Sequence, residues 1–395
     1  MIRASLDRKN FEVYPFFGIL VLLFGLLWNS CLHGGDFKVF YLAGERFLHH
    51  VPLYQVTDGW SPFKYHPSWA VFFSLWSLLP LTLSVLLFNF INILFWTDAA
   101  RSWARLLNYK FTPASLFLLL VLSLNALSAE TAYGQINGFL FWGSTRIFLW
   151  MEEASPKPLR SGVLLAVLIS LKLNFGILAF YLFSKHRRAP LGLALGGLGL
   201  HVLALLAFRE TPCRELYRSW LDLLLTQSRE QFNTFEVQSM LRACYIFFGE
   251  PLAKTAWAAL LGAFVLGGVF LDRVYFRNET DSAKRKALAG AYWLTVIFLF
   301  SPLAWWYQVL YLFPCAFLLL KIFPQKPWQP LIRACLLSFA FISFNTLGRE
   351  GIFKFKFYMG YFAASLVLFA ILVAALVKIR PQTIQAGDRM GISFN

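Results

Sequence analysis

Long apolar runs separated by short basic clusters dominate the chain. About 20 consecutive apolar residues suffice for a helix that crosses the hydrocarbon core of a bilayer. Several runs approach this length, and others are about half as long. The pattern predicts an all-α polytopic membrane protein with about twelve transmembrane helices. They are expected near residues 11–32, 82–100, 112–129, 136–150, 161–172, 174–184, 190–208, 252–271, 288–304, 306–321, 331–346 and 358–378.

The basic clusters predict the orientation, because short loops rich in lysine and arginine stay in the cytoplasm. The first run has no small-x-small cleavage site after it, so we expect it to be a retained helix rather than a signal peptide. Both termini are then cytoplasmic. We expect a core at 1–250, further membrane helices at 251–380 and a tail at 381–395. The clusters assigned to the inside are Arg101/Arg105/Lys110, Lys157/Arg160, Lys185/Arg187/Arg188, Arg273/Arg277/Lys284/Arg285/Lys286, Lys321/Lys326/Arg333 and Lys378/Arg380.

Three segments deviate from simple crossings. The stretch 161–184 is basic at both ends, which predicts two half-length helices bent near Lys172 that return to the same side. Short broken helices usually line a cavity. The apolar stretch 66–79 is followed by Pro80 and another crossing, so it is expected to dip into the outer leaflet as part of loop 33–81. Loop 209–250 mixes charged and apolar residues at helical spacing, which predicts an amphipathic surface helix.

Composition supports the membrane class and excludes another. With 58% hydrophobic and 14% charged residues, the chain has too little polar surface for a water-soluble protein of this size. The net charge of +16 lies in short clusters between apolar runs, which favours anionic lipid head groups and excludes nucleic acid as a partner. The five cysteines include no CxxC pair, so neither a zinc site nor a disulfide framework is indicated. A bridge between Cys213 and Cys244 within one outer loop stays open.

Asp36 is the leading candidate for a functional carboxylate, because it directly follows the first apolar run. An ionisable residue where a membrane helix meets water is a site hypothesis by default. The same carboxylate, placed after Gly34 and Gly35, is also suited to cap the next helix, a role that contributes about 1 kcal/mol. The residues alone leave both interpretations open.

The predicted outer turns carry short motifs in a specific order. Their succession over about residues 36–320 resembles glycosyltransferase family 87, a family of GT-C membrane enzymes similar to polyprenyl-phosphate-mannose-dependent mannosyltransferases. The motifs are Asp36-Phe37 with Phe40-Tyr41-x-Ala43-Gly44, Pro52-Leu53-Tyr54, Phe63-x-Tyr65-x-Pro67, Gly134-Gln135-Ile136-Asn137, Leu171-Lys172, Gln238-Ser239-x-Leu241-Arg242 and Ser301-Pro302-x-Ala304-Trp305.

The resemblance implies a GT-C fold in the plasma membrane, an active site on the extracytoplasmic side and a catalytic base at Asp36. It also implies a polyprenyl-phosphate hexose as donor, with mannose favoured, and a cell-envelope glycolipid or glycan as acceptor. One departure stands out: many members have Ser-Pro-x-x-Trp-Asp-His-His, whereas this chain has Trp306-Tyr307-Gln308 in place of the last three residues. A non-catalytic lipid-binding or scaffold protein derived from a transferase therefore remains an alternative. A transporter is less favoured, because ionisable pairs within the spans and two similar halves are not evident.

The chemistry predicts roles for further residues. Sugar transfer from a polyprenyl phosphate requires a base near the acceptor hydroxyl and cationic or hydrogen-bonding groups around the departing phosphate. One carboxylate suffices when the anomeric centre is inverted. No Asp-x-Asp pair occurs among the outer carboxylates, which argues against a metal-bridged nucleotide sugar, so neither a metal nor another cofactor is expected. The donor phosphate is assigned to Arg242 first, and otherwise to Lys172, Lys64 or His66. Substrate contacts are assigned to Gln135, Asn137, Tyr65, Gln238, Tyr307 and Gln308.

These assignments have simpler alternatives. Amides in a short turn often satisfy helix ends. Lys172 is also suited to neutralise a helix break or to snorkel. Aromatic and basic residues around Tyr65 are typical of an interfacial belt. Tyr307 and Gln308 are equally compatible with a place in the protein core.

Overall fold

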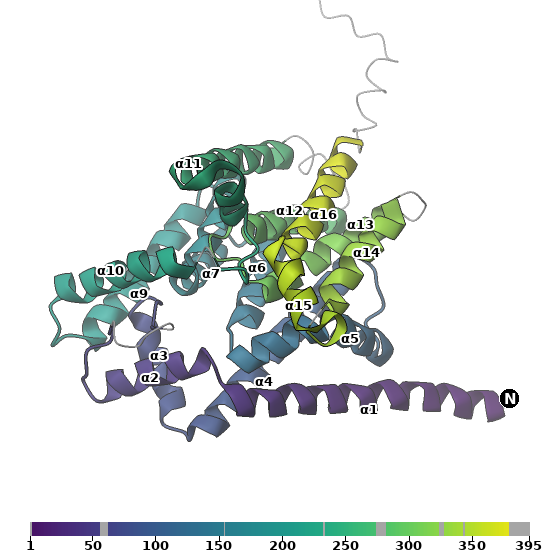
Figure 1. Cartoon of the computed structure of the whole chain (residues 1–395), viewed down its shortest axis with the longest axis horizontal. Coiled ribbons are helices and arrows are strands. Elements are labelled where there is room, and N and C mark those ends of the chain that lie inside the picture. The colour runs from purple at the N-terminus through teal and green to yellow at the C-terminus, as the bar shows by residue number, and fades with distance from the viewer. Residues whose placement is uncertain are drawn as a thin grey trace, which may run out of the picture.

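The computed structural model describes residues 2–55, 62–153, 155–231, 234–273, 282–323, 328–342 and 344–378, and these form a bundle of helices joined by turns (Figure 1). The predicted all-α membrane class is confirmed. The predicted tail at 381–395 lies outside the described residues. The helices in chain order are α1 (Ile2–His33), α2 (Phe37–Leu48), α3 (Ser68–Ser77), α4 (Leu81–Leu106), α5 (Pro113–Tyr133), α6 (Asn137–Met151), α7 (Pro158–Leu171), η2 (Leu173–Ile177), α8 (Leu178–Lys185), α9 (Ala189–Ala207), α10 (Cys213–Gln231), α11 (Met240–Leu271), α12 (Ser282–Phe300), η4 (Trp306–Leu312), α13 (Phe313–Ile322), α14 (Trp328–Phe341), α15 (Phe344–Phe357) and α16 (Gly360–Lys378).

Five helices among the described residues are long and apolar enough to cross a membrane. They are Tyr14–His33, Leu81–Leu106, Pro113–Tyr133, Ala189–Ala207 and Met240–Leu271. A sixth span results if Leu347–Phe357 and Gly360–Leu376, which are bent by 55°, are counted as one. Shorter apolar helices account for several other predicted segments, so the count of twelve crossings stays a prediction.

The predicted break in the stretch 161–184 is present. Helix α7 ends at Leu171, Lys172 adopts extended backbone angles (φ −142°, ψ 112°), and the chain continues through η2 into α8. Because Lys172 leaves the helical conformation at this point, its side chain is placed at the junction of two short helices. The break therefore positions a charged residue that a continuous helix would have placed within its span.

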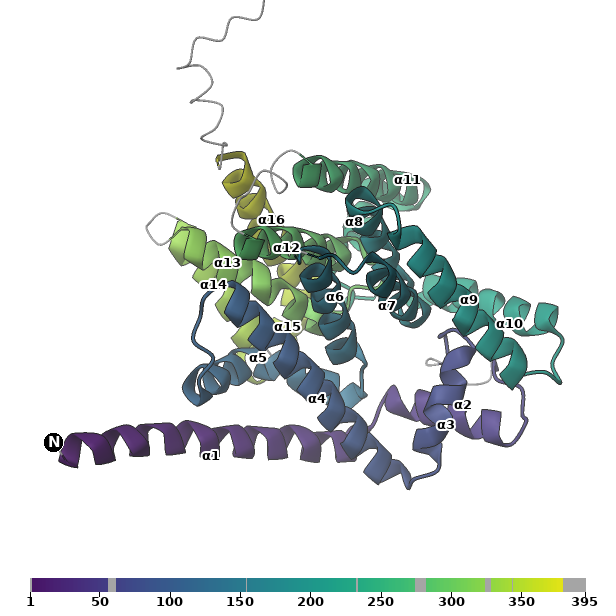
Figure 2. The same cartoon turned by 180° about the vertical axis from the view of Figure 1, so that it is seen from behind.

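Helix α12 forms the centre of the core. Every residue from Ala287 to Phe300 is buried, as expected for a helix that is apolar on all sides and enclosed by others. It contacts α6, α11, α13 and α16, which lie around it in Figure 2. This enclosed helix leads directly into the turn that contains Ser301 and Trp305, and so fixes that turn relative to α5 and α6.

The two long segments predicted to cover the outer side contact each other. Helices α2 and α3 lie beside α9 and α10 in both views (Figures 1 and 2). The Trp220 indole donates to the Lys64 carbonyl at 2.9 Å. Helix α10 is amphipathic as predicted, with Leu216 and Leu223 buried and Leu221 exposed beside charged residues. All five cysteines are unpaired, with Cys213 exposed and Cys244 buried, so the bridge that the sequence left open is not formed.

Candidate active site

Two glycine turns bring Asp36 to the end of α5. Gly34 (φ +54°) follows the end of α1, and Gly134 (φ +65°) caps α5. The Gly35 amide donates to the Ala132 carbonyl at 3.1 Å, which joins the two turns directly. A Cβ atom on Gly134 would lie 2.5 Å from the Phe37 Cβ, a separation that only glycine avoids. The close approach places the residue after Gly35 next to the residue after Gly134.

The Asp36 carboxylate is half-buried and takes part in a tertiary contact rather than a helix cap. It forms no side-chain cap on α2 and instead accepts a hydrogen bond from the Gln135 side-chain amide. The structure therefore does not support the capping interpretation. Burial raises the pKa of Asp36 above its ordinary value, while the charges of Lys172 and Lys64 and the Gln135 hydrogen bond oppose this shift.

Lys172 connects Asp36 to a second, deeper carboxylate through amide side chains. Its ammonium group donates to Asn137 Oδ1 at 2.7 Å and lies 3.4 Å from Gln135 Oε1. Asn137 Nδ2 in turn donates to Glu130 Oε1 at 2.6 Å. The structure thus brings together four residues that the sequence analysis singled out, from three separate parts of the chain. They are Asp36, Gln135, Asn137 and Lys172.

Glu130 and Tyr311 belong to this group but were missed by sequence analysis. The Tyr311 hydroxyl donates to Asn137 Oδ1 at 3.1 Å, and Gln308 Nε2 lies 3.5 Å from the same oxygen. Glu130 is 6% exposed near the end of an otherwise apolar span. An ionisable residue at such a position is a candidate functional residue, because a buried charge in a membrane is costly to keep. Tyr311 gave no comparable signal among many aromatic residues.

A small cavity lies at the deep side of this network. It has a volume of ≈ 20 Å³ and is lined by polar residues, among them Glu130, Gln135, Asn137 and Gln308, and by apolar residues of α4, α5 and α6. A cavity of this size holds about one water molecule when two or more polar groups converge on it. This cavity is therefore too small for a sugar.

Of the predicted donor-phosphate residues, Lys64 and Lys172 lie near enough to Asp36 to act on its charge, and His66 has a different role. Burial, with a smaller effect of His201, lowers the pKa of His66 to about 4. The imidazole lies 3.2 Å from the Tyr217 hydroxyl and 2.9 Å from the Ser68 hydroxyl. It is neutral near pH 7 and joins α10 to the segment before α3, which lends no support to a contact with the donor phosphate, and that assignment stays a prediction.

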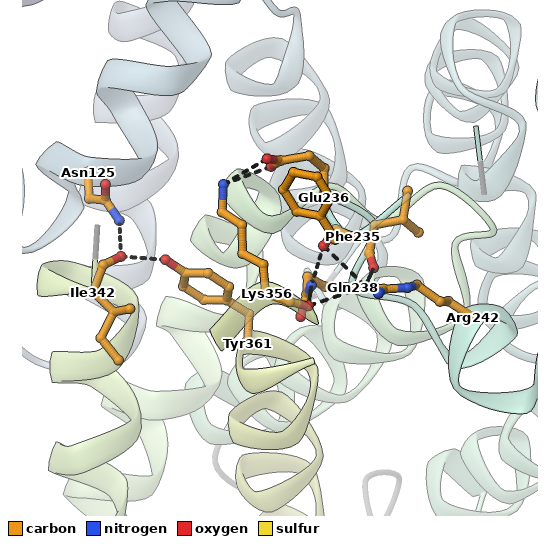
Figure 3. A network of polar contacts seen from close by, with 9 residues as sticks. Asn125, Phe235, Glu236, Gln238, Arg242, Ile342, Lys356 and Tyr361 are labelled. Atoms are coloured by element: carbon orange, nitrogen blue, oxygen red, sulfur yellow. Dashed lines mark hydrogen bonds and ion pairs between the residues drawn. The ribbon is translucent and has the colours of Figure 1, made fainter. Parts of the chain in front are cut away.

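Arg242 and Gln238 belong to a network of hydrogen bonds to the backbone beside the site rather than to the lining of the site (Figure 3). The Arg242 guanidinium donates to the backbone carbonyls of Phe235, Val237, Lys356 and Phe357 at 3.0–3.3 Å. Gln238 is fully buried and bonds to the backbone of residues 235, 356 and 362. Their side chains join α11 to the α15–α16 break, so these contacts lend no support to a donor phosphate at Arg242 or a substrate contact at Gln238, and both assignments stay predictions.

The segment that departs from the family pattern is aromatic and packed. Tyr307 is 3% exposed, parallel to Trp305 at 6.2 Å and close to Tyr133 at 5.7 Å. The Lys356 ammonium lies 4.6 Å from the Trp306 ring centre. Tyr65, another predicted substrate residue, packs edge-on against the Phe40 ring at 4.9 Å. Rings and one cation therefore occupy the place where many members are expected to have acidic and histidine side chains.

Comparison with known protein families shows to which class of protein the chain belongs. The model of glycosyltransferase family 87 matches residues 63–302, which is more than half of the chain. The chain therefore belongs to glycosyltransferase family 87 and is a membrane glycosyltransferase. The matched range includes Glu130, Gln135, Asn137 and Lys172 and begins after Asp36. No curated protein and no solved structure matches the chain.

Proposed function

We propose that the protein transfers a hexose, with mannose favoured, from a polyprenyl-phosphate sugar to a glycolipid or glycan acceptor of the cell envelope. Asp36 acts as the general base. It removes the proton of the acceptor hydroxyl while that oxygen attacks the anomeric carbon, the bond from that carbon to the phosphate oxygen breaks, and the polyprenyl phosphate leaves with the bonding electrons. A single base and attack opposite the leaving group give inversion of the anomeric centre.

The observation that carries this proposal is the environment of Asp36. A base is most effective when its pKa is raised toward the working pH, and burial moves the pKa of Asp36 in that direction. Within the described part of the chain its carboxylate accepts one side-chain hydrogen bond, from Gln135, which leaves lone pairs for a substrate hydroxyl. Cationic groups also stand nearby, as the departing phosphate requires.

Lys172 and Lys64 are the groups we assign to that phosphate. Lys172 is held by neutral amide oxygens of Gln135 and Asn137, so its charge is oriented without being neutralised by them. A fixed cation in a water-poor site stabilises negative charge that develops on a leaving group. No metal or other cofactor enters this scheme, and the lipid-linked sugar is a co-substrate.

The test uses purified protein in lipid nanodiscs with radiolabelled polyprenyl-phosphate mannose and polyprenyl-phosphate glucose. With chelator present, we expect transfer to an extracted envelope glycolipid and a product of inverted anomeric configuration. Strict dependence on a nucleotide sugar and a divalent ion would exclude the proposed donor. Binding of lipid donor with no transfer to any acceptor fraction would favour the non-catalytic alternative. In this proposal the site faces the extracytoplasmic side of the plasma membrane, and labelling of a cysteine introduced at Tyr133 in whole cells tests that orientation.

A further inference from the structure

A large aromatic ring is exposed directly beside Asp36. Tyr133 ends α5 and remains 45% exposed. Its ring lies against Tyr307, which stacks on Trp305, and we call these three residues the aromatic ladder. Tyr307 is buried and Trp305 is half-buried, so Tyr133 is the member of the ladder most accessible to a ligand.

The backbone of Gly35, directly before Asp36, packs closely against Tyr133. A Cβ atom on Gly35 would be 3.1 Å from Tyr133 Cδ1 and 3.2 Å from Tyr133 Cα. Because Asp36 is the next residue, its carboxylate and the exposed ring belong to the same small area of the surface. The charge of Glu236 acts on the Tyr133 hydroxyl, and the charge of Asp36 acts on it less strongly.

Glu236 supplies a second carboxylate at the rim of this area. It forms an ion pair with Lys356 through both oxygens, at 2.8 and 3.0 Å, and its side chain remains 28% exposed. The Trp306 amide donates to the Glu236 carbonyl at 3.2 Å, next to a β-bridge between Val237 and Trp305. The backbone of Glu236 is therefore fastened to the aromatic ladder, and its carboxylate is held in place by Lys356.

An exposed aromatic face next to fixed carboxylates suits a pyranose. The C–H groups on one face of a sugar ring pack on an aromatic ring, and its hydroxyls donate to carboxylate oxygens. Sites of this kind combine an apolar wall with a few placed polar groups. We propose that Tyr133, supported by the other two rings of the aromatic ladder and flanked by Glu236, forms the subsite that binds the acceptor sugar and presents its hydroxyl to Asp36.

Charge decides between acceptor and donor at this subsite. The donor carries a phosphate next to its sugar, and the cation beside Glu236, Lys356, already pairs with both oxygens of that carboxylate and is not available to the phosphate. The acceptor sugar carries no such group at its reacting hydroxyl. The cations Lys172 and Lys64 act on Asp36 and suit the donor phosphate, so the two substrates meet at Asp36 from differently charged surroundings. This inference rests on the proposed function, since it names the acceptor side of the same site.

The first experiment measures sugar binding without any donor. Saturation-transfer NMR with methyl α-mannoside and methyl α-glucoside is recorded on the full chain in nanodiscs. Tyr133→Ala is expected to weaken binding of the preferred hexoside about tenfold, and Tyr133→Phe, which keeps the ring, should lie much closer to the wild type. Tyr109→Ala is the matched control, because Tyr109 is 43% exposed at the other end of the α4–α5 pair. Equal binding in the wild type and Tyr133→Ala, or no hexoside binding at all, would overturn the proposal.

The second experiment separates this subsite from the proposed reaction. In the transfer assay, Tyr133→Ala should raise the KM for the acceptor about tenfold and change the KM for the lipid donor little. If both hexosides bind at Tyr133 but no lipid donor is consumed, the proposed reaction is wrong and the sugar subsite stands. If transfer proceeds and Tyr133→Ala keeps the wild-type acceptor KM, the reaction stands and the subsite is wrong. The second result would assign Tyr133 to the aromatic belt at the membrane interface.

Discussion

Two polar clusters lie at the two ends of α6, and they are built differently. We call the group of Asp36, Glu130, Gln135, Asn137 and Lys172 the site cluster. Asn137 is the first residue of α6, and Glu152 follows its last residue. With 15 residues in the helix, these ends are about 22 Å apart at 1.5 Å per residue. Each cluster joins several helices. In one cluster the charged groups contact each other directly, and in the other amide side chains lie between them.

The second group, which we call the salt-bridge cluster, consists of Glu152, Lys185, Asp272 and Arg285. Lys185 Nζ lies 2.6 Å from both Glu152 Oε1 and Asp272 Oδ1, and Arg285 Nε lies 2.7 Å from Glu152 Oε2. Two acids face two bases, and the acids are 5% and 3% exposed. The ends of α6, α8 and α11 are thereby tied to the beginning of α12, at positions predicted to lie in cytoplasmic loops.

In the site cluster, amides stand between the charges. Lys172 contacts amide oxygens of Gln135 and Asn137, and within the described ranges no ion pair joins it to Asp36 or Glu130. In the salt-bridge cluster the buried acids and bases neutralise one another, whereas in the site cluster the amides position charged groups and leave them capacity to act on a substrate. The comparison indicates that the mode of pairing, rather than the number of charges, distinguishes a structural cluster from a reactive one.

The largest effect on this comparison is expected from Asp36→Asn. Asn cannot remove a proton, so turnover per folded molecule should fall by about 10²–10⁴-fold, the usual contribution of a positioned base. Asp36→Glu should also be impaired, because the added methylene displaces the carboxylate by roughly 1 Å. The measurement is single-turnover transfer in nanodiscs, normalised to protein that elutes as a monodisperse species.

Asp222→Asn is the matched control for the loss of a carboxylate. Asp222 lies on α10, its side chain is 68% exposed, and it pairs with Arg218 at 3.6 Å. We expect wild-type turnover for it. Retained turnover in Asp36→Asn would remove the carboxylate from the mechanism and end the contrast between a reactive and a structural cluster.

The reverse pattern is expected for Lys185→Met in the salt-bridge cluster. Removal of one partner leaves two buried carboxylates without their shared cation, which typically costs about 3–5 kcal/mol of stability. Thermal unfolding in detergent should show a large decrease in Tm, while turnover per folded molecule stays unchanged. Lys354→Met removes an exposed ion pair with Glu350 and should change stability by less than about 1 kcal/mol. A large loss of turnover in folded Lys185→Met would show that this cluster also serves the reaction.

The sequence predicted those parts of the molecule in which a local pattern has one physical solution. Basic residues on both sides of a short apolar stretch predicted the break at Lys172, and helical spacing of charged and apolar residues predicted α10. The motif order predicted that Asp36, Gln135 and Lys172 belong to one site, and the structure brings them together.

Long-range partners could not be predicted. The sequence analysis assigns Arg242 to a phosphate, whereas in the structure its donors bond to carbonyls of residues 235, 237, 356 and 357, partly from a segment more than 100 residues away. Glu130 was overlooked because its role depends on Asn137, seven positions further on across a turn whose shape the sequence does not reveal. The exposure of Tyr133 likewise depends on how two glycine turns meet.

The smallest predicted effect concerns pH and the charges around Asp36. The base must be ionised to accept a proton, so kcat/KM should fall as the pH decreases through the pKa of Asp36, which burial raises above the ordinary value for aspartate. Lys172 opposes that shift, so in Lys172→Gln the acid limb should move to higher pH, in addition to any loss of donor binding.

The raised pKa of Asp36 affects the stability of the fold in the opposite direction. A raised pKa in the folded protein means that the ionised carboxylate destabilises the fold at neutral pH, and this cost disappears as the pH falls through the raised pKa. At pH 7 the inactive variant Asp36→Asn should therefore unfold at the same temperature as the wild type or higher. A profile of kcat/KM against pH for Lys172→Gln and a profile of Tm against pH for Asp36→Asn, each compared with the wild type, test this directly. An acid limb that stays in place when Lys172 is neutralised would mean that its charge does not act on the base, and would leave the amide-bridged site cluster without the electrostatic coupling that distinguishes it from the salt-bridge cluster.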